Sequence, residues 1–518
     1  MKPTQLDPSL STVLVTGATG FVGRQVCLRL AREGVRVIAW VRSPAQARGN
    51  LGQGPELLAV DAPTPELVAA LERCDAVIHL AGAGIFDRRW SAERKRELRA
   101  SRVDTTTRLV EALARTSRKP ALVSASAVGW YGPRGDEALD EDSAPGSDYL
   151  GGLCQAWEQS AMAARAHGVR VAIARIGIVL GLGGGALERM LPPFRLGLGG
   201  PLGSGRQWMS WIHAEDLVEL LVRAARDERF QGVFNAVAPT PATNRDFTRV
   251  LAGALRRPAF LPAPAFALRI ALGEAANVLL TGQRVTPRRA REWGFEFRFP
   301  TLESALEQLV GRATSVSIGP ARDVPDCDYL KRSAPRYLLA QETRIPAPLE
   351  EVFEFFSRAE NLGAITPAAM SFRMLAPAGQ PMHAGREIDY AIRVGPVPMR
   401  WRSRIEEFKP LEQFVDSQMR GPYANWWHEH RFERTPEGGT LMRDRVWYAP
   451  PLGPLGAVAQ RVLVAPQLEA VFRYREHAIA LRFGRVDEGG GAAAAGDAGS
   501  ASASSARHEK GPRTLARS

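Results

Sequence analysis

Cysteine and long apolar runs are both scarce in this chain. Its 518 residues include four cysteines that lie far apart and form no CxxC pair, Cys27, Cys74, Cys154 and Cys327. That spacing argues against both a disulfide framework and a cysteine-based zinc site. No run of about 20 apolar residues is present, so we expect no transmembrane segment. The first residues contain no apolar stretch long enough for a signal peptide, and we predict a soluble, cytoplasmic protein.

Acidic residues are outnumbered, with 55 Asp and Glu against 67 Lys and Arg, which gives a net charge of +12 at pH 7. Such an excess is typical of proteins with nucleic-acid or anionic-membrane partners. The basic residues are mostly arginines, however, and they are spread along the chain without a long basic block. Because no helix-turn-helix, zinc-finger or RNA-binding motif accompanies them, we expect no nucleic-acid partner.

Two patterns of hydrophobicity divide the chain. In the first, short β-branched runs alternate with helix-length segments, which is typical of βαβ units in a parallel sheet. Strands are expected at residues 12–15, 35–41, 76–80, 121–123 and 169–176. We therefore predict an α/β fold with a Rossmann-type, doubly wound parallel sheet over residues 11–243 and a helical module over residues 244–314.

Alternating strands dominate the second pattern. They are expected at residues 338–345, 386–394, 399–408, 413–419, 426–433 and 440–448, with helices at 349–356 and 455–483. Sequential strands joined by short turns form antiparallel sheets. Residues 337–484 are therefore predicted to be a separate α+β domain.

Three segments look unable to form a core. Residues 1–10 are predicted to be an N-terminal tail, and residues 315–336, which combine prolines with an aperiodic polar pattern, a linker. Residues 485–518 are rich in Gly, Ala and Ser, and we expect them to be disordered.

A glycine-rich turn follows the first strand and opens a helix, with the sequence GATGFVG at residues 17–23. Glycines at these positions let the backbone turn tightly and approach a pyrophosphate, which the helix N-terminus then stabilises. The alternative is an ordinary βα turn that needs positive φ. We predict that the turn binds a dinucleotide through Gly17, Thr19, Gly20, Phe21, Val22 and Gly23.

No acidic residue ends the second strand. In NAD-binding folds an Asp or Glu at this position bonds the ribose 2′-hydroxyl, whereas an arginine accommodates a 2′-phosphate. The chain has Arg42 here, whose guanidinium suits a phosphate dianion. The alternative is a solvated surface arginine. We predict NADP(H) as the cofactor in preference to NAD(H).

Further motifs follow in a fixed order: HLAG at 79–82, DRRW at 87–90, SRVDTT at 101–106, SASAVGWYG at 124–132, GGG at 183–185, LPPFRLGLGG at 191–200 and GSGRQWMSWIH at 203–213. Together they resemble the extended short-chain dehydrogenase/reductase superfamily, and within it the atypical branch similar to nucleoside-diphosphate-sugar epimerases. The likeness covers about residues 10–312, and the helical module resembles the small C-terminal module of that branch.

The resemblance implies further cofactor contacts. It places Leu80, Ala81 and Gly82 beside the adenosine, Glu97 and Arg102 near the cofactor, and Val179 near the nicotinamide. Each of the last three has an alternative, because Glu97 and Arg102 fit a charged helix face and Val179 fits a core.

The active-site lysine of this superfamily is missing. Ser126 stands where the family serine stands, and Tyr149 stands where the family tyrosine opens a helix. Four residues after the tyrosine lies Leu153, and no lysine occurs between Lys119 and Lys331. Without a neighbouring cation a phenol is rarely ionised at pH 7. Either another group acts as the base, or the domain binds NADP(H) without efficient turnover.

Other groups could replace the missing base. Tyr131 stands two residues after the Val-Gly of the serine motif, where it is expected to point into the cleft, and Trp211 and His213 end the GSGRQWMSWIH segment. Histidine titrates in the useful range, although His213 also suits the start of a helix over residues 214–226. Cys154 could act as a nucleophile only if a nearby cation lowered the pKa of its thiol. The alternative is an unreactive thiol buried in a helix.

The second domain resembles the START-like helix-grip superfamily, chiefly through ETRIPAPLEEVFEFF at residues 342–356. That resemblance implies a curved sheet around a long helix and an apolar cavity for a hydrophobic ligand. Candidate lining residues, which alternatively fill a core, are Trp401, Trp426, Trp427, His428, His430 and Trp447. Alternation puts Trp426, His428 and His430 on one face. The two histidines could share a metal, but no third ligand stands out, so we expect none.

We therefore expect an NADP(H)-dependent oxidoreductase or epimerase-like enzyme that acts on a small molecule. The fused domain would raise the concentration of a hydrophobic substrate or product near the cofactor. The alternative is an NADP(H)-sensing or ligand-binding protein without efficient catalysis.

Overall fold

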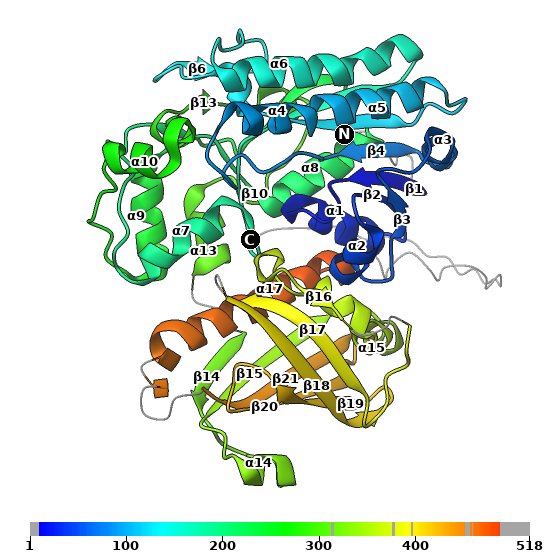
Figure 1. The fold of residues 1–518 in the computed structure, drawn as a ribbon, viewed down its shortest axis with the longest axis vertical. Coiled ribbons are helices and arrows are strands. Elements are labelled where there is room, and N and C mark those ends of the chain that lie inside the picture. Colours follow the sequence, from blue (N-terminus) through cyan, green and yellow to red (C-terminus); the bar gives the residue numbers. More distant parts are fainter. Residues whose placement is uncertain are drawn as a thin grey trace, which may run out of the picture.

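The computed structural model describes residues 10–311, 315–375, 379–394, 397–450, 456–457 and 459–486. The described residues form two lobes (Figure 1), an α/β lobe at the top and a lobe built on a curved antiparallel sheet below it. Helix α17 (Ala465–Phe483) lies between them, packed along α1 (Phe21–Arg32) of the first lobe. Of the tails predicted at residues 1–10 and 485–518, residues 1–9 and 487–518 lie outside the described residues, whereas Arg485 is described and pairs with Glu215, so the second tail begins later than predicted.

The first lobe contains a parallel sheet, which has seven strands within the described part of the chain. Their order is β11 (Gly232–Ala236), β7 (Val171–Ile176), β5 (Ala121–Ala127), β4 (Ala76–His79), β1 (Thr12–Thr16), β2 (Arg36–Val41) and β3 (Glu56–Ala59). The central strands β1 and β4 are buried throughout and mostly apolar because both of their faces are covered. The five predicted strands are confirmed. The two outer strands β3 and β11 were missed, since they are partly exposed and less apolar.

Helices cover both faces of this sheet (Figure 1). Helices α1 and α8 (Ala214–Arg226) pack on one face, while α3 (Thr64–Glu72), α5 (Val103–Ala114) and α6 (Tyr149–Met162) pack on the other. The predicted doubly wound Rossmann-type arrangement is therefore confirmed. Among the described residues, no helix combines the length and apolarity needed to cross a membrane.

The region after residue 243 is helical, as predicted. Its helices are α9 (Asn244–Leu255), α10 (Ala265–Leu272), α11 (Asn277–Leu280), α12 (Arg288–Glu292) and α13 (Leu302–Val310). Helix α9 begins with a capping box, in which the Thr243 side chain accepts from Asp246 N and the Asp246 side chain accepts in return. Helices α9 and α13 pack together, and their core is continuous with that of the second lobe.

The second lobe is an antiparallel sheet, with eight strands among the residues described. The order is β14 (Val316–Pro320), β15 (Tyr337–Ile345), β21 (Thr440–Ala449), β20 (Asn425–Arg434), β19 (Gln413–Arg420), β18 (Val397–Lys409), β17 (Glu387–Val394) and β16 (Arg373–Met374). The sheet curves around α17 (Figure 1). Helix α15 (Leu349–Phe356) and the six predicted strands are confirmed, so this lobe has the predicted helix-grip arrangement.

The predicted linker over residues 315–336 is wrong. Strand β14 pairs with β15 at the edge of the sheet, and α14 (Asp328–Arg332) follows it. The rest of the segment covers the outer face of the sheet, where Trp447 donates to the Arg322 carbonyl at 2.9 Å and Tyr329 packs against Trp427. An edge strand with one partner needs little apolar pattern, which explains why the sequence did not indicate it.

Buried polar contacts dock the two lobes. Arg24 of α1 is 3% exposed and donates to the carbonyls of Gly363 and Thr366, the latter at 2.7 Å. Ala368 N donates to the Gly183 carbonyl at 2.9 Å. The loop at residues 359–370 therefore belongs to the second lobe but is bonded to two segments of the first.

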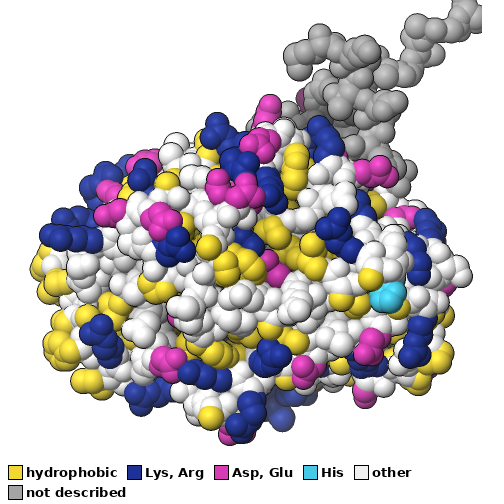
Figure 2. Space-filling model, turned by 90° about the horizontal axis from the view of Figure 1, so that it is seen from above, with side chains coloured by type: hydrophobic (Ala, Val, Ile, Leu, Met, Phe, Trp, Pro, Cys, Tyr) yellow, Lys and Arg dark blue, Asp and Glu magenta, His cyan; other side chains and the backbone are white. Residues whose placement is uncertain are grey.

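Charge is dispersed over the surface. On the face shown in Figure 2, Lys and Arg side chains alternate with Asp and Glu and with apolar groups, and no continuous basic patch forms there. Basic side chains on this face are thus interspersed with acidic ones, as the absence of a long basic block in the sequence indicates.

Candidate functional site

The glycine-rich turn packs tightly against the backbone that follows β4. Gly17 has φ of +63°, and a Cβ there would lie 2.7 Å from the Leu80 carbonyl oxygen. At Gly23 a Cβ would lie 2.2 Å from the Gly17 carbonyl oxygen. Gly20 is exposed and begins α1, and a Cβ there would meet a single neighbour, the Gly17 oxygen at 3.1 Å. Gly17 and Gly23 therefore shape the turn, while Gly20 faces the open side.

A buried histidine fixes the segment that faces this turn. The Thr16 hydroxyl lies 2.7 Å from His79 Nδ1 and accepts from the N–H groups of Leu80 and Ala81 at 3.0 Å. His79 Nε2 lies 2.9 Å from the Thr106 hydroxyl. Burial lowers the pKa of His79 to about 4, so the ring is neutral. No local sequence pattern indicated this role, because the ring is held by Thr16 and Thr106 from two other elements.

Charged residues gather at the same edge of the parallel sheet. Arg42 is exposed just after β2. Glu97, on α4 (Ala92–Ala100), pairs with Arg94 at 2.7 Å, and the pKa of Glu97 is lowered by that hydrogen bond and, more weakly, by Arg42. Arg102 donates to the Ala83 carbonyl at 3.0 Å and packs under the Gly82 backbone. Cofactor contacts by Glu97, Arg102 and Arg42 stay predictions.

Phe21 lies in a cradle of glycines. A Cβ at Gly181, Gly184 or Gly185 would come within 2.8 or 2.9 Å of its ring. This glycine loop joins β8 (Ile178–Leu180), which contains Val179, to α7 (Gly185–Arg195). Two glycines of the GGG motif, Gly184 and Gly185, therefore leave room for the Phe21 ring beside the turn. The contact of Val179 with the nicotinamide stays a prediction.

The Ser126 hydroxyl is used inside the protein. Its Oγ donates to Glu158 Oε1 at 2.6 Å. Arg175 holds the same carboxylate with Nε at 2.9 Å and Nη2 at 3.0 Å, and all three side chains are buried. The hydroxyl proton therefore points to Glu158. The sequence did not indicate this, because Glu158 lies 32 residues away on α6.

Tyr149 is half-buried at the start of α6. Its hydroxyl donates to the Lys95 carbonyl at 3.1 Å, and Lys95 Nζ lies 4.7 Å from the ring centroid while pairing with Glu274 at 2.7 Å. Burial raises the pKa of Tyr149, and the opposing effect of Arg102 is smaller. The phenol is therefore protonated at neutral pH, as the absence of the family lysine predicts.

Two of the alternative groups are buried away from solvent. Burial raises the pKa of Cys154 to about 12, so this thiol is unreactive, and Leu153 is also buried. Tyr131 is 0% exposed, donates to Asn235 Oδ1 at 2.7 Å and accepts from Arg175 Nη1 at 3.1 Å. Burial raises its pKa to about 12. The expectation that Tyr131 points into the cleft is therefore wrong.

His213 has a structural role, so its prediction as a replacement base is wrong. Its Nδ1 accepts from Glu215 N at 3.2 Å and caps α8, and its Nε2 lies 3.1 Å from Gln308 Oε1. The ring is 0% exposed and packs on Phe299 at 3.8 Å. Burial lowers its pKa to about 4. Its neighbour Trp211 is likewise buried.

The second lobe encloses an apolar cavity of about 200 Å³. Four of the six predicted lining residues, Trp401, Trp426, His428 and His430, are among those that line it. Trp427 and Trp447 instead face the side of the sheet covered by residues 320–336. The alternation predicted along β20 is confirmed, since Trp426, His428 and His430 are buried on the cavity side.

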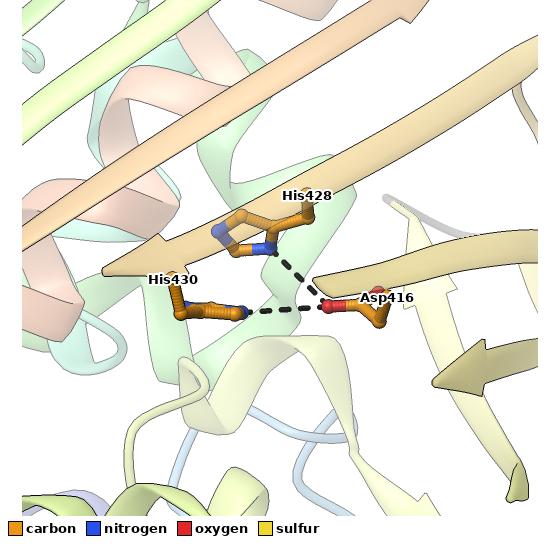
Figure 3. Close-up of side chains that lie close together, drawn as sticks. All are labelled: Asp416, His428 and His430. Atoms are coloured by element: carbon orange, nitrogen blue, oxygen red, sulfur yellow. Dashed lines mark ion pairs between the residues drawn. The ribbon is translucent and has the colours of Figure 1, made fainter. Parts of the chain in front are cut away.

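One end of this cavity is polar. His428 and His430 on β20 face Asp416 on β19 (Figure 3), with Asp416 Oδ1 at 3.7 Å from His428 Nδ1 and 3.4 Å from His430 Nε2. Behind them lies Asp444 on β21, beside Arg475 of α17 at 3.4 Å. Burial opposes ionisation of both aspartates, but the pKa of Asp416 is lowered by the histidines and that of Asp444 by Arg475 and the histidines.

The sequence located the two histidines but not their carboxylates. Asp416 pairs across the sheet with His428, and Asp444 with His430. The register in which the strands pair brings these residues together, and no local sequence pattern indicates that register.

Comparison with known proteins assigns each part of the chain. Residues 13–236 match the NAD dependent epimerase/dehydratase family, residues 263–309 match a domain of unknown function, DUF1731, and residues 345–472 match the polyketide cyclase/dehydrase and lipid transport family.

Individual relatives resemble the first lobe. The chloroplastic homologue of epimerase family protein SDR39U1 from Arabidopsis thaliana is 42% identical over 307 residues, which cover 58% of this chain and 87% of the relative. The human SDR39U1 protein is 40% identical over 306 residues, covering 58% and 99%. A crystal structure of human SDR39U1 (isoform 2) with NADPH matches with a TM-score of 0.52 and 38% identity, over 58% of this chain and 99% of that one. The chain therefore belongs to the epimerase family that includes SDR39U1.

Proposed function

We propose that this protein binds NADP(H) at the turn formed by residues 17–23 and uses it to reduce a carbonyl group of a small molecule. The observation that carries the proposal is the shape of the glycine-rich turn at residues 17–23. Side chains at Gly17 and Gly23 would collide with backbone atoms, and the open side at Gly20 leaves the N-terminus of α1 accessible to an anion. A pyrophosphate fits this arrangement.

Arg42 supports the choice of NADP(H) over NAD(H). It is exposed at the end of β2, where a ribose-binding fold would carry an acid if the 2′-hydroxyl were to be bound. The human relative crystallised with NADPH is consistent with this choice. When bound, the cofactor would supply a hydride.

Tyr149 is the best placed proton donor. Its phenol is protonated at neutral pH and half-exposed, so it can donate to a carbonyl oxygen but is a poor base. A protonated phenol at this position therefore favours reduction over oxidation. Ser126 would act indirectly, through the Glu158–Arg175 pair, because its side chain is buried, unlike that of Tyr149, and its hydroxyl donates to Glu158.

The second lobe would hold a small hydrophobic substrate or product. The cavity of about 200 Å³ has aromatic walls and one polar end, as sites for apolar ligands with a polar group do. The compartment stays a prediction: the sequence indicates the cytoplasm, whereas one relative is named as chloroplastic.

A second candidate is an NADP(H)-regulated binding protein without net chemistry. It is favoured by a specific observation, namely that the hydroxyls of both Ser126 and Tyr149 are bonded to protein groups. In that case nucleotide binding would act on the cavity through the loop at residues 359–370, which bonds to Arg24 and Gly183.

The two candidates differ in a direct test. Full-length protein is titrated with NADPH and NADH by fluorescence, and NADPH oxidation is then followed over a panel of aldehydes and ketones. Binding with turnover that depends on Tyr149 supports the reductase. Binding without turnover on any carbonyl supports the regulated protein, and absence of NADPH binding refutes both.

A further inference from the structure

Asp416 and the two histidines at the polar end of the second-lobe cavity have the spacing of metal ligands rather than of hydrogen-bond partners. Asp416 Oδ1 lies 3.7 Å from His428 Nδ1 and 3.4 Å from His430 Nε2 (Figure 3). A hydrogen bond between nitrogen and oxygen spans about 2.7–3.2 Å. Two ligands of a tetrahedral ion with bonds of about 2.1 Å are instead about 3.4 Å apart. The three ligand atoms all lie within 4.8 Å of one another.

Asp444 supplies the outer contacts that such a site needs. Its Oδ1 lies 3.1 Å from His428 Nε2 and 2.7 Å from His430 Nδ1, the ring nitrogens that face away from Asp416. A carboxylate in this position takes the ring protons and turns the remaining lone pairs toward a metal. One carboxylate thus contacts both rings, while Arg475 Nη2, 3.4 Å from Asp444 Oδ1 and 3.2 Å from His430 Nδ1, offsets its charge.

The charge and the walls of the site favour a cation. Two carboxylates face one guanidinium among these buried groups, which leaves an excess of negative charge. Asp416 keeps 17% of its side chain exposed, toward the cavity that Trp426 and Phe472 also line. An ion held by three side chains would therefore keep an open position facing the cavity.

We propose that Asp416, His428 and His430 bind one divalent first-row transition metal ion, such as Zn²⁺, at the polar end of the second-lobe cavity. Two imidazoles and one carboxylate suit these ions, whereas Mg²⁺ and Ca²⁺ require more oxygen ligands. The open position would take an oxygen atom of the ligand in the cavity. This site is independent of the nucleotide site in the first lobe.

The test uses the full-length protein stripped with a chelator and titrated with Co²⁺, followed by visible absorption, with Zn²⁺ competition and total-metal analysis. We expect one Co²⁺ per chain, displaced by Zn²⁺, and no competition from Ca²⁺. His428→Gln, His430→Gln and Asp416→Asn should each weaken Co²⁺ binding more than the roughly 10–100-fold expected for the outer-contact variant Asp444→Asn.

Controls separate loss of a ligand from loss of the fold. His383→Gln removes an exposed histidine of the same lobe and should bind Co²⁺ as the wild type does. If a site variant unfolds, NMR of the wild type with bound Co²⁺ tests the histidine ligands instead. Two shifted, exchangeable ring N–H signals would identify two histidine ligands. Binding of Co²⁺ by a His428→Gln/His430→Gln double variant with wild-type affinity, or no binding by the wild type, overturns the proposal.

Discussion

Neutralising Glu215 should weaken the docking of the two lobes in a pH-dependent way. This carboxylate, in the first turn of α8, is 7% exposed and faces the second lobe. It pairs with Arg485 at 2.6 Å and with His477 Nδ1 at 3.2 Å. Burial alone would raise the pKa of Glu215, but its contacts with His477, His213 and Arg485 lower it from 4.5 to about 2.

The size of the effect follows from this shift. A difference of about 2.5 units, at about 1.4 kcal/mol per unit, corresponds to about 3 kcal/mol of stability. Because the folded-state pKa is depressed, this stability is present above the unfolded-state value and is lost as the pH falls toward the folded-state value. Glu215→Gln should therefore cost about 3 kcal/mol at pH 7 but only about 1 kcal/mol at pH 3.

Urea unfolding of wild type and Glu215→Gln at pH 7 and pH 3 measures both values. Glu303→Gln is the matched control, because Glu303 also lies in the first turn of a helix, α13, but is exposed. Its effect should stay within about 0.5 kcal/mol at either pH. An equal cost of Glu215→Gln at both pH values, or a cost no larger than that of Glu303→Gln, would refute the reasoning.

Three further predictions concern the nucleotide site. Arg42→Ala should remove most of a preference for NADPH over NADH of about tenfold, about 1.4 kcal/mol, and equal wild-type affinities in fluorescence titration would contradict it. Gly20→Val should abolish NADPH binding with an unchanged thermal midpoint, whereas Gly23→Ala should lower that midpoint, because its Cβ would lie 2.2 Å from a carbonyl oxygen. Once a carbonyl substrate is found, Tyr149→Phe should lower kcat, but only toward the low end of the roughly 10²–10⁴-fold typical of losing a general acid, because burial raises the pKa of this phenol and makes it a weaker acid. A larger loss in steady-state kinetics would mean that the phenol is activated by a group we have not identified.

The sequence predicts the sheets well because their patterns are local. The patterns of β1, β4 and β20 each indicate which faces of the strand are buried. The glycine-rich turn is a specific signal because it directly follows a strand. These features depend on residues within about one element of each other, so periodicity and turn chemistry are enough to find them.

The site was harder to predict because its contacts join distant elements. His213 loses its candidacy through Phe299 and Gln308, which are far along the chain. Ser126 meets Glu158 from another element, and His428 meets Asp416 only through the register of two strands. Residue types identified the candidates, but burial and partners decided between structural and chemical roles.

Strand β14 determines where the second lobe can be cut from the chain. A fragment starting at residue 337, the boundary that hydrophobic patterning indicates, would leave the backbone of β15 unpaired along one edge and would uncover Trp427 and Trp447. An open edge next to exposed tryptophans is a template for self-association. A fragment that starts before Val316 would keep β14 paired with β15 and Trp427 and Trp447 covered, so it would be less prone to self-association than one starting at residue 337.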